Sequence, residues 1–426
     1  MSSSVQRRLG TADAVVLGLA AMLGTGVFAV WAPAAAAAGP WLLVAILLAG
    51  VVATCNAAST ADLAVAHPES GGGYVYGRER LGPAAGRLAG VAFLVGKTAS
   101  AAAAAGVFGW YVLPANPLAT ALVVIVVATA MNIAGVRWTA LTAWALVGGT
   151  MVVLLLVIVA GIFGGAEDLS ASALAQAAGP AEPLGPMPGG RVLGVLTAAG
   201  LVFFAFAGYA RIATLGEEVR DPRHTLRRAI MIALAITMIT YLLVGTALLV
   251  GLGSERLVAE PSPLVALVDT EQTSALGVLV RVGAAVAAGS ALLSVLVGVS
   301  RTTLAMARRG ELPRSLAVIG GRGTPWRADL VGGAVAIVLA VLTGPAAAIA
   351  LSACSVLIYY AMINLAALRL PPADRRWSPW TAWLGLLLCV TLAVLLPVQQ
   401  VLVTAVALVA GWTTCTALSH RPHPHP

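Results

Sequence analysis

Long apolar segments recur along almost the whole of this 426-residue chain, and short polar connections separate them. About 20 mostly apolar residues are needed to cross roughly 30 Å of hydrocarbon, so these segments favour helices that span a membrane. Hydrophobic residues make up 60% of the chain and charged residues 10%, which excludes an ordinary soluble domain. The expected fold class is therefore an all-α membrane protein. We predict twelve transmembrane helices, at residues 12–32, 41–66, 84–113, 118–135, 138–163, 192–216, 229–252, 274–300, 329–344, 346–369, 380–397 and 400–418.

Basic residues are distributed unequally between the two ends of the predicted spans. Of the 25 lysines and arginines, 20 lie at the ends that we place inside, three lie within spans, and Arg191 and Arg256 lie outside. Because cytoplasmic loops carry the excess of Lys and Arg, we expect both termini to be cytoplasmic in a multi-pass protein of the plasma membrane. The basic balance reflects this sidedness and predicts no nucleic-acid partner. We expect the first apolar stretch to stay as a helix, because it leads straight into a second span.

Other functional classes lack their sequence signals. The four cysteines lie in apolar spans and the five histidines in loops or the tail, so no disulfide framework, metal site or cofactor is predicted. The spans contain no HExxH motif and no paired carboxylates, so an enzyme is not expected. The phosphate-binding motif of ATP-driven pumps is also missing from the sequence.

Glycines interrupt two predicted spans at corresponding positions. Gly24 and Gly26 flank Thr25 in the first span, and Gly208 follows an aromatic cluster in the sixth. Matching interruptions in two halves of a transporter indicate an inverted repeat with the binding site between the halves. Five spans in each half would give the second half the opposite orientation. The predicted organisation is a cytoplasmic N-terminus (1–11), a first repeat (12–163), an extracellular loop (164–191), a second repeat (192–369), two further helices (370–418) and a cytoplasmic tail (419–426).

An interrupted helix frees main-chain groups that must be satisfied within the membrane. The N–H groups at the start of one half-helix and the carbonyls at the end of another can hold a carboxylate and an ammonium group. Glycine permits both the required dihedral angles and a close approach of the ligand. Close packing of neighbouring helices is the alternative reason for glycine in a membrane helix, and it stays open at this point.

Four motifs, in order, give this chain a family resemblance. They are "GLAAMLGTGVF" (18–28), "HPESGGGYVYGRERLGP" (67–83), "FFAFAGYARIATLGEEVRDPRHTLRRAI" (203–230) and "SRTTLAMARRGELP" (300–313). Together they resemble the amino acid–polyamine–organocation transporters, whose fold is a five-plus-five inverted repeat with broken first and sixth helices. The resemblance implies alternating access around a site at the two breaks.

Carried over by position, the resemblance implies that main chain at both breaks holds an amino acid and that Phe204 covers it. Phe206 is either a second wall of the site or a core aromatic residue. Many relatives have a carboxylate two residues after the sixth-span glycine, where this chain has Ala210, followed by Arg211. The implied backbone residues are Leu23, Gly24, Thr25, Gly26, Val27, Ala207, Gly208 and Tyr209.

Coupling to an ion has several candidates. Relatives that use protons often have a Lys in the fifth span, at a position that falls near Thr150 here. The hydroxyls of Ser290 and Ser294 could serve a sodium site or simply pack between helices. Lys97 is the only lysine and could carry a proton; alternatively it pairs with a carboxylate such as Asp62 or with freed carbonyls.

The other two basic residues that we place within predicted spans are Arg211 and Arg281. Arg211 either anchors its helix at the cytoplasmic interface, which we favour, or places a fixed positive charge near the pathway. Arg281 is expected to reach outward to Asp269 or Glu271. In the tenth span, Tyr359, Tyr360 and Asn364 could also shape the pocket.

The sequence thus predicts a secondary active transporter of small, neutral L-amino acids, coupled to protons. Main chain can hold the amino and carboxyl groups, whereas a cationic side chain would face basic residues in the spans. The alternatives are a transporter of cationic amino acids or polyamines, an amino acid exchanger, and a sensor or channel on the same scaffold.

Overall fold

The computed structural model describes residues 9–67, 71–135, 140–163, 189–213, 219, 221–269 and 275–419. Helices dominate these residues, and no β-strand occurs among them; an isolated parallel bridge joins Leu9 to Val219. Most of the predicted loop 164–191, the tail beyond residue 419, and Glu217 and Glu218 lie outside the described residues.

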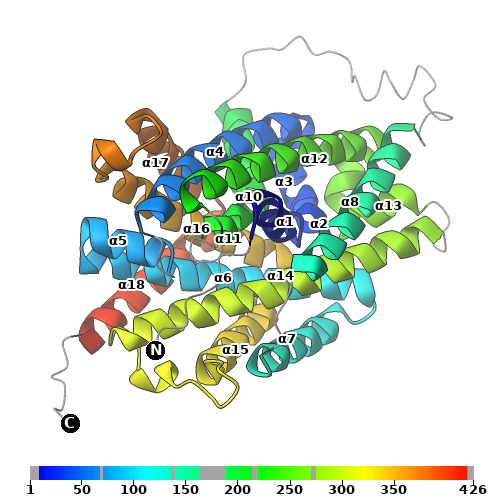
Figure 1. Cartoon of the computed structure of the whole chain (residues 1–426). Helices are drawn as coiled ribbons and strands as arrows, with labels where there is room; N and C mark the ends of the chain where they lie inside the picture. Colours follow the sequence, from blue (N-terminus) through cyan, green and yellow to red (C-terminus); the bar gives the residue numbers. More distant parts are fainter. Residues whose placement is uncertain are drawn as a thin grey trace.

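All twelve predicted spans fall on helices (Figure 1). In the described part of the chain, nine helices or pairs of consecutive helices are long and apolar enough to cross a membrane. These are α1 (Thr11–Met22) with α2 (Gly26–Ala29), α3 (Trp31–Ala38) with α4 (Leu42–Ala66), α6 (Pro83–Val112), α8 (Ala140–Phe163), α10 (Gly189–Phe206) with α11 (Ala210–Ala213), α12 (Pro222–Ala259), α14 (Ala275–Arg308), α16 (Pro345–Leu368) and α18 (Val398–Ser419).

Three further predicted spans coincide with helices of 16 or 17 residues, namely α7 (Pro117–Ile133), α15 (Trp326–Leu342) and α17 (Pro379–Val394). The short helices α5 (Gly73–Leu81) and α13 (Pro263–Val268) lie between spans. This succession of apolar helices supports a multi-pass membrane protein.

Two helices extend beyond their predicted spans. For the predicted span 229–252, α12 begins earlier, at Pro222, and it is kinked at Gly253, where φ is +71°, so the predicted end coincides with the kink. For the predicted span 274–300, α14 continues through Arg308. The extensions carry charged side chains such as Arg227 and Arg308, and a search for apolar residues detects only the part of a helix that suits hydrocarbon. The charged turns of α14 bring polar groups to one end of the bundle.

Proline marks the start of many of these helices. Its missing N–H and fixed φ suit the first turn of a helix, where that N–H would have no partner within the helix. Proline therefore helps to determine the residue at which each of these helices begins. Proline occupies the first turn at Pro83, Pro117, Pro222, Pro263, Pro345 and Pro379.

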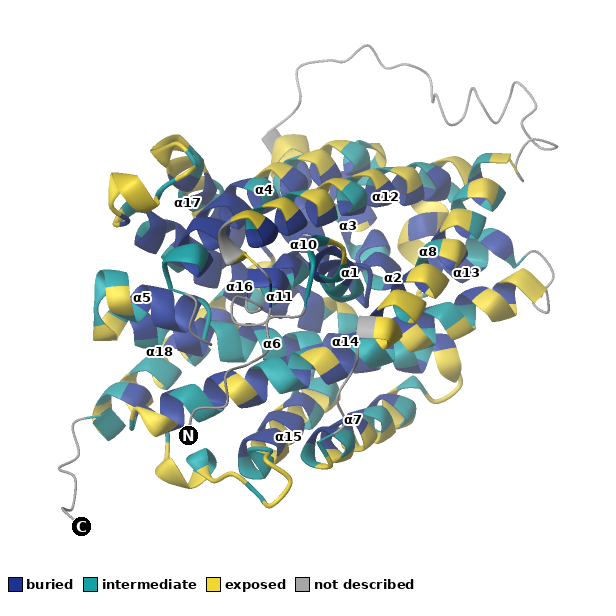
Figure 2. Ribbon diagram, in the orientation of Figure 1, coloured by how far each residue is buried: buried dark blue, intermediate teal, exposed yellow. Residues whose placement is uncertain are grey.

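The interrupted segments lie inside the bundle (Figure 1). Helix α1 contacts α8, α12 and α14, and α10 contacts α3, α4 and α16. Figure 2 shows buried residues on the inward faces of these helices and exposed residues on outward faces. Large apolar side chains such as Val126 and Leu155 are exposed on α7 and α8, as expected for surfaces that face lipid.

Candidate functional site

Regular helix stops in the first span between Met22 and Gly26. Residues 23–25 form a turn in which Leu23 N–H still donates to the Leu19 carbonyl at 2.7 Å. Across the described part of the chain, Gly24, Thr25 and Val27 donate no backbone hydrogen bond. The Thr25 side chain is buried, and its hydroxyl has no partner among the described residues. The first break therefore presents unpaired hydrogen-bond donors.

A second interruption follows the aromatic cluster of the sixth span. Helix α10 ends at Phe206, residues 207–209 form one 3₁₀ turn, and α11 continues from Ala210. A 3₁₀ turn is narrower than an α-helix and breaks its i→i−4 bonding pattern. The interruption is thus a tightening of the chain at the predicted position, less open than the turn in the first span.

The two interruptions touch through their glycines. A Cβ atom on Gly208 would lie 2.4 Å from the Ala21 carbonyl carbon, and one on Gly26 would lie 2.5 Å from Ala205 Cα. No side chain fits at these distances, so only glycine lets the two main chains come so close. These glycines therefore lie at interruptions of their helices and also allow the two helices to pack closely.

Aromatic side chains cap carbonyls near the breaks. The Tyr241 hydroxyl lies within hydrogen-bonding distance of two carbonyl oxygens, 2.5 Å from Met22 and 3.1 Å from Ala205. Tyr360 donates to the Ala207 carbonyl at 3.3 Å. Farther along the first span, Tyr111 Oη and Trp31 Nε1 donate to the carbonyls of Phe28 and Val27. Side-chain donors therefore form hydrogen bonds with carbonyls of both breaks, whereas the amide N–H groups of Gly24, Thr25 and Val27 have no acceptor among the described residues.

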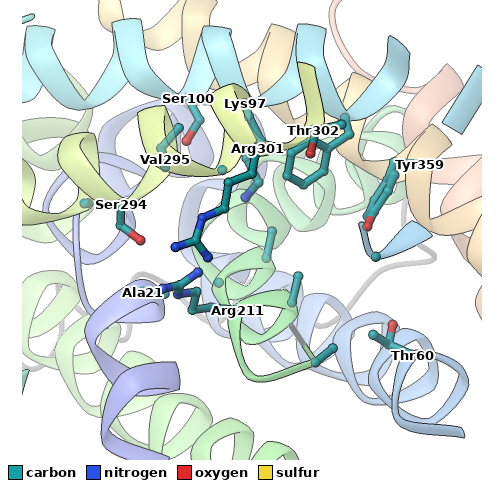
Figure 3. A pocket seen from close by; sticks show the side chains of 18 of the residues that line it. Ala21, Thr60, Lys97, Ser100, Arg211, Ser294, Val295, Arg301, Thr302 and Tyr359 are labelled. Carbon is teal, nitrogen blue, oxygen red and sulfur yellow. The ribbon is translucent and has the colours of Figure 1, made fainter. Parts of the chain in front are cut away.

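One cavity of about 390 Å³ joins the two breaks. Thr25 and Gly26 line it from the first span, and Phe204, Ala207 and Gly208 from the sixth. Figure 3 shows side chains from several helices converging on this space. It continues along one face of α14 toward the start of α5, and the lining there includes Ala291, Ser294, Gly298, Arg301, Ala305, Arg308, Gly72 and Tyr76.

The remaining sequence-predicted main-chain residues lie close to this cavity without lining it. Leu23, Val27 and Tyr209 are buried, and Gly24 packs against Ala291, where a Cβ would meet the alanine Cβ at 2.8 Å. Phe206 is a core residue whose ring lies 4.9 Å from the ring of Tyr241. Its alternative role as a wall of the site is therefore wrong.

The coupling candidates divide into two groups. Lys97 and Ser294 line the cavity, whereas Thr150 is buried elsewhere. Ser290 donates to the Ala287 carbonyl of its own helix at 2.9 Å. These positions bring one amine and one hydroxyl from the four candidates into contact with the pathway.

Positive charge dominates the described lining of the cavity. Lys97, Arg211, Arg301 and Arg308 line it, together with no described acidic residue. The proposed pairing of Lys97 with Asp62 is wrong, because Asp62 instead accepts hydrogen bonds from the Arg227 guanidinium at 2.7 and 3.1 Å. Lys97 Nζ lies 5.9 Å from the centre of the Phe93 ring.

Two buried carboxylates tie helices together at the Arg308 end of the cavity. Asp62 joins α4 to Arg227 of α12 and also accepts from the backbone N–H of Arg376 at 3.0 Å. Glu311, just after α14, pairs with Arg78 of α5 and accepts the Tyr74 hydroxyl at 2.5 Å. Burial, together with the hydrogen bond to Glu311, raises the pKa of Tyr74, so this phenol stays protonated and donates.

A separate ion pair lies at the other end of the bundle. Arg281 Nη2 is 3.8 Å from Asp269 Oδ2, and this confirms one of the two partners expected for Arg281. Its guanidinium is therefore engaged outside the central cavity. Among the described residues, no three His, Cys, Asp or Glu side chains come together as a metal site would require.

Comparison with known proteins identifies what the chain is similar to. A family model described as amino acid permease matches residues 13–415. The chain is 48% identical over 408 residues to an uncharacterized transporter of Mycobacterium tuberculosis. The aligned region covers 96% of this chain and 90% of that protein. It is 25% identical over 347 residues to a branched-chain amino acid permease of Bacillus subtilis, with 74% and 70% covered. It is 27% identical over 338 residues to a chloroplastic cationic amino acid transporter of Arabidopsis thaliana, with 73% and 57% covered.

Proposed function

This chain belongs to the amino acid permease family and is an amino acid transporter, and from that premise we propose that it carries small, neutral L-amino acids by alternating access. The observation that carries the proposal is the cavity of about 390 Å³ that both helix interruptions line. Binding sites for small molecules commonly begin at about 300 Å³, so this volume suits a small amino acid.

The substrate's carboxylate would bind the amide donors of Gly24, Thr25 and Val27, with the Thr25 hydroxyl as a further donor. These groups have no hydrogen-bond acceptor among the described residues. The start of α2 also places the positive end of a helix dipole there. The ammonium group would face main chain at the second break, around Ala207 and Gly208. Leu23, Gly26 and Tyr209 would shape the site through the backbone, and Phe204 would cover the substrate.

The charges of the cavity favour a neutral amino acid over a cationic one. Four basic side chains and no described acidic side chain line it. Like charges repel strongly where water is partly excluded, so a lysine-like or polyamine substrate would be disfavoured. The relatives' printed names include both branched-chain and cationic substrates, so this argument rests on the charges of this chain's own cavity.

The sidedness follows from the basic residues. The cavity reaches the end of the bundle that carries Arg308. Because cytoplasmic ends carry the excess of Lys and Arg, we propose that this end faces the cytoplasm and that the cavity opens inward, in a plasma-membrane transporter with twelve spans and five-plus-five repeats. Both termini would then be cytoplasmic.

Proton coupling through Lys97 is the coupling mode that we propose. An amine in a partly dry cavity can release its proton when a second positive charge or a closing gate approaches. The hydroxyl of Ser290 bonds to its own helix, and Gly24 packs directly on Ala291, so Ser294 is the only one of the two candidate serines whose hydroxyl could bind a sodium ion between the first and eighth spans. Exchange without a net ion gradient is the alternative mode.

Uptake by purified protein in lipid vesicles tests the proposal. Labelled alanine, leucine, lysine and putrescine would be offered with a proton gradient, a sodium gradient or neither. We expect saturable uptake of the neutral amino acids, accelerated by an inward proton gradient. Preferential uptake of lysine or putrescine would overturn the substrate assignment, and flux without saturation would indicate a channel.

A further inference from the structure

We propose that a groove between α6 and α18 binds an anionic phospholipid, with one acyl chain in the groove and the headgroup phosphate on Arg87. The site lies on the surface of the bundle that faces lipid, apart from the central cavity. It does not depend on the identity of the substrate or of the coupling ion, and the leaflet that supplies the lipid follows from the sidedness proposed above.

The groove is a hollow of about 330 Å³ on the outside of the bundle. Helix α18 lies at the edge of the bundle (Figure 1), and its buried residues are Thr404, Leu408 and Cys415. A Cβ atom on Gly411 would lie 2.5 Å from Val91 Cγ1, so the two helices come closest to each other beside the hollow. Apolar side chains line it, among them Val91, Leu94 and Val95 of α6 and Ala407 and Ala410 of α18.

Hydrocarbon is the material that suits this hollow. A hollow without contents forfeits the van der Waals contacts of its walls, and water in it would find few polar partners. Lipid tails are as apolar as the walls, so moving a tail from the bilayer into the groove changes the hydrophobic free energy little. The groove therefore accommodates an acyl chain, and selection of one class of lipid requires a polar group at its end.

Arg87 supplies that polar group. Residues four apart lie on the same face of a helix, so Arg87 is one turn from Val91 along the groove face of α6. On α18, Ser419 follows Cys415 by the same spacing, and Arg87 Nη1 donates to the Ser419 hydroxyl at 3.2 Å. The contact between these two side chains marks the polar end of the groove.

A tryptophan places Arg87 at the depth of the lipid headgroups. Trp412 Nε1 donates to the carbonyl of Ala84 at 3.1 Å, within one turn of Arg87. Tryptophan is enriched at membrane–water interfaces, where its ring lies at the level of the headgroups. Counted from Arg87, Val91 and Val95 lie about 6 and 12 Å farther along α6 at 1.5 Å per residue. A phosphate on Arg87 would therefore have its acyl chains beside the groove.

The guanidinium of Arg87 has donors available for a phosphate. Its bond to Ser419 uses one of five N–H donors, and within the described residues Arg87 forms no ion pair, while its Nε has no hydrogen-bond partner. Glu311, next to Leu312 of the groove, is engaged by Arg78 and Tyr74. Basic pockets between membrane helices at the cytoplasmic surface bind anionic headgroups, and a guanidinium matches the geometry of phosphate.

Thermal stabilisation of the purified protein in detergent tests the site. The melting temperature would be measured with added dioleoyl phosphatidylglycerol, dioleoyl phosphatidylcholine, or glycerol phosphate, which carries the anionic group without acyl chains. A ligand that binds the folded state raises its stability with concentration. The variants are Arg87→Gln, Arg87→Lys and Ala410→Leu, of which the last fills the groove. The controls are Arg322→Gln, at an exposed loop residue of the same charge, and Ala405→Leu, at an exposed alanine of α18 that does not line the groove.

We expect phosphatidylglycerol to raise the melting temperature at a concentration about fivefold lower than phosphatidylcholine. Arg87→Gln should remove this difference, and Arg87→Lys should keep most of it because lysine retains the charge. Ala410→Leu should weaken the effect of both lipids, since its side chain occupies the hollow. Both control variants should match the unaltered protein, and a cooperative transition without added lipid shows that each variant is folded.

Several results would overturn the site. Equal stabilisation by the two lipids, or none by either, would show that no anionic phospholipid is selected. Stabilisation by glycerol phosphate as strong as that by phosphatidylglycerol would show that the anion does not need the groove. Full preference in Arg87→Gln, or unchanged lipid binding in Ala410→Leu, would place the lipid elsewhere. A dimer in light scattering that Ala410→Leu separates would mean that a second copy of the chain fills the groove.

Discussion

The hydroxyl group of Tyr241 lies 2.5 Å from the carbonyl oxygen of Met22, the last residue of the first half-helix. The same hydroxyl is 3.1 Å from the carbonyl oxygen of Ala205 in the sixth span. One side chain of α12 therefore connects the two interrupted spans, because its hydroxyl lies within hydrogen-bonding distance of a main-chain acceptor in each. This contact helps to hold both interruptions in register beside the cavity.

Tyr241→Phe should destabilise the protein and slow transport. Removing the hydroxyl leaves two buried carbonyls without that donor, and an unpaired buried polar group costs about 1–3 kcal/mol. The control is Tyr111→Phe, which removes a hydroxyl bonded at 3.2 Å to a single carbonyl, that of Phe28. Melting temperature and initial uptake rate would be compared in one detergent and one lipid. Equal effects of the two variants would contradict a linking role for Tyr241.

Gly208→Ala should disrupt the contact between the breaks. The added Cβ would lie 2.4 Å from the Ala21 carbonyl carbon, so backbone must move, and such overpacking typically costs about 1–3 kcal/mol. Gly148→Ala is the matched control, since a Cβ there meets nothing within 4 Å. We expect loss of most substrate binding for Gly208→Ala and none for Gly148→Ala. Normal binding by Gly208→Ala would show that close approach of the breaks is unnecessary.

The positions of these breaks could be predicted from the sequence, whereas the side chains that donate to their carbonyls could not. Gly24, Gly26 and Gly208 stand out because glycine weakens a helix whatever surrounds it. Tyr241 stands in an ordinary apolar run, "ITYLLV", and its role depends on which carbonyls a neighbouring helix brings within reach. Contacts of this kind come from tertiary packing and leave no local signal.

Asp62→Asn should cost far more stability than Glu260→Gln. Asp62 is buried, pairs with Arg227 at 2.7 Å and accepts a backbone N–H of Arg376, and breaking a buried pair costs about 3–5 kcal/mol. Glu260 forms an i,i+4 pair with Arg256 at 3.8 Å, in which both side chains are partly exposed. Exposed pairs are worth about 0–1 kcal/mol. Chemical or thermal unfolding would measure the difference, and similar losses would show that Asp62 is not a structural clamp.

Lys97→Gln and Lys97→Arg should both abolish acceleration by a proton gradient and leave exchange of internal for external substrate. Glutamine carries no titratable proton, and arginine keeps its proton at all relevant pH values. Uptake into vesicles with and without an imposed pH difference is the measurement. Full gradient dependence in Lys97→Gln would exclude Lys97 as the proton carrier.

The charge of the cavity was only partly visible in the sequence. Lys97 and Arg211 stand out as basic residues within apolar spans, whereas Arg301 belongs to a cytoplasmic motif beyond the predicted end of its span. Because α14 continues to Arg308, residues 294, 298, 301 and 305 recur at helical spacing on the face that lines the cavity. Helical periodicity extended beyond the apolar segment could have identified this face, whereas its convergence with Arg211 depends on the packing of two distant helices.

The central claim is that main chain at two adjoining helix interruptions binds a zwitterionic amino acid. An experimental structure of the purified protein with a bound neutral amino acid tests it most directly. The account predicts that the carboxylate lies within 3.2 Å of amide nitrogens among Gly24, Thr25 and Val27, a usual limit for such bonds, with the ammonium group beside Ala207 and Gly208. A ligand bound elsewhere, or two continuous α-helices at these positions, would contradict it.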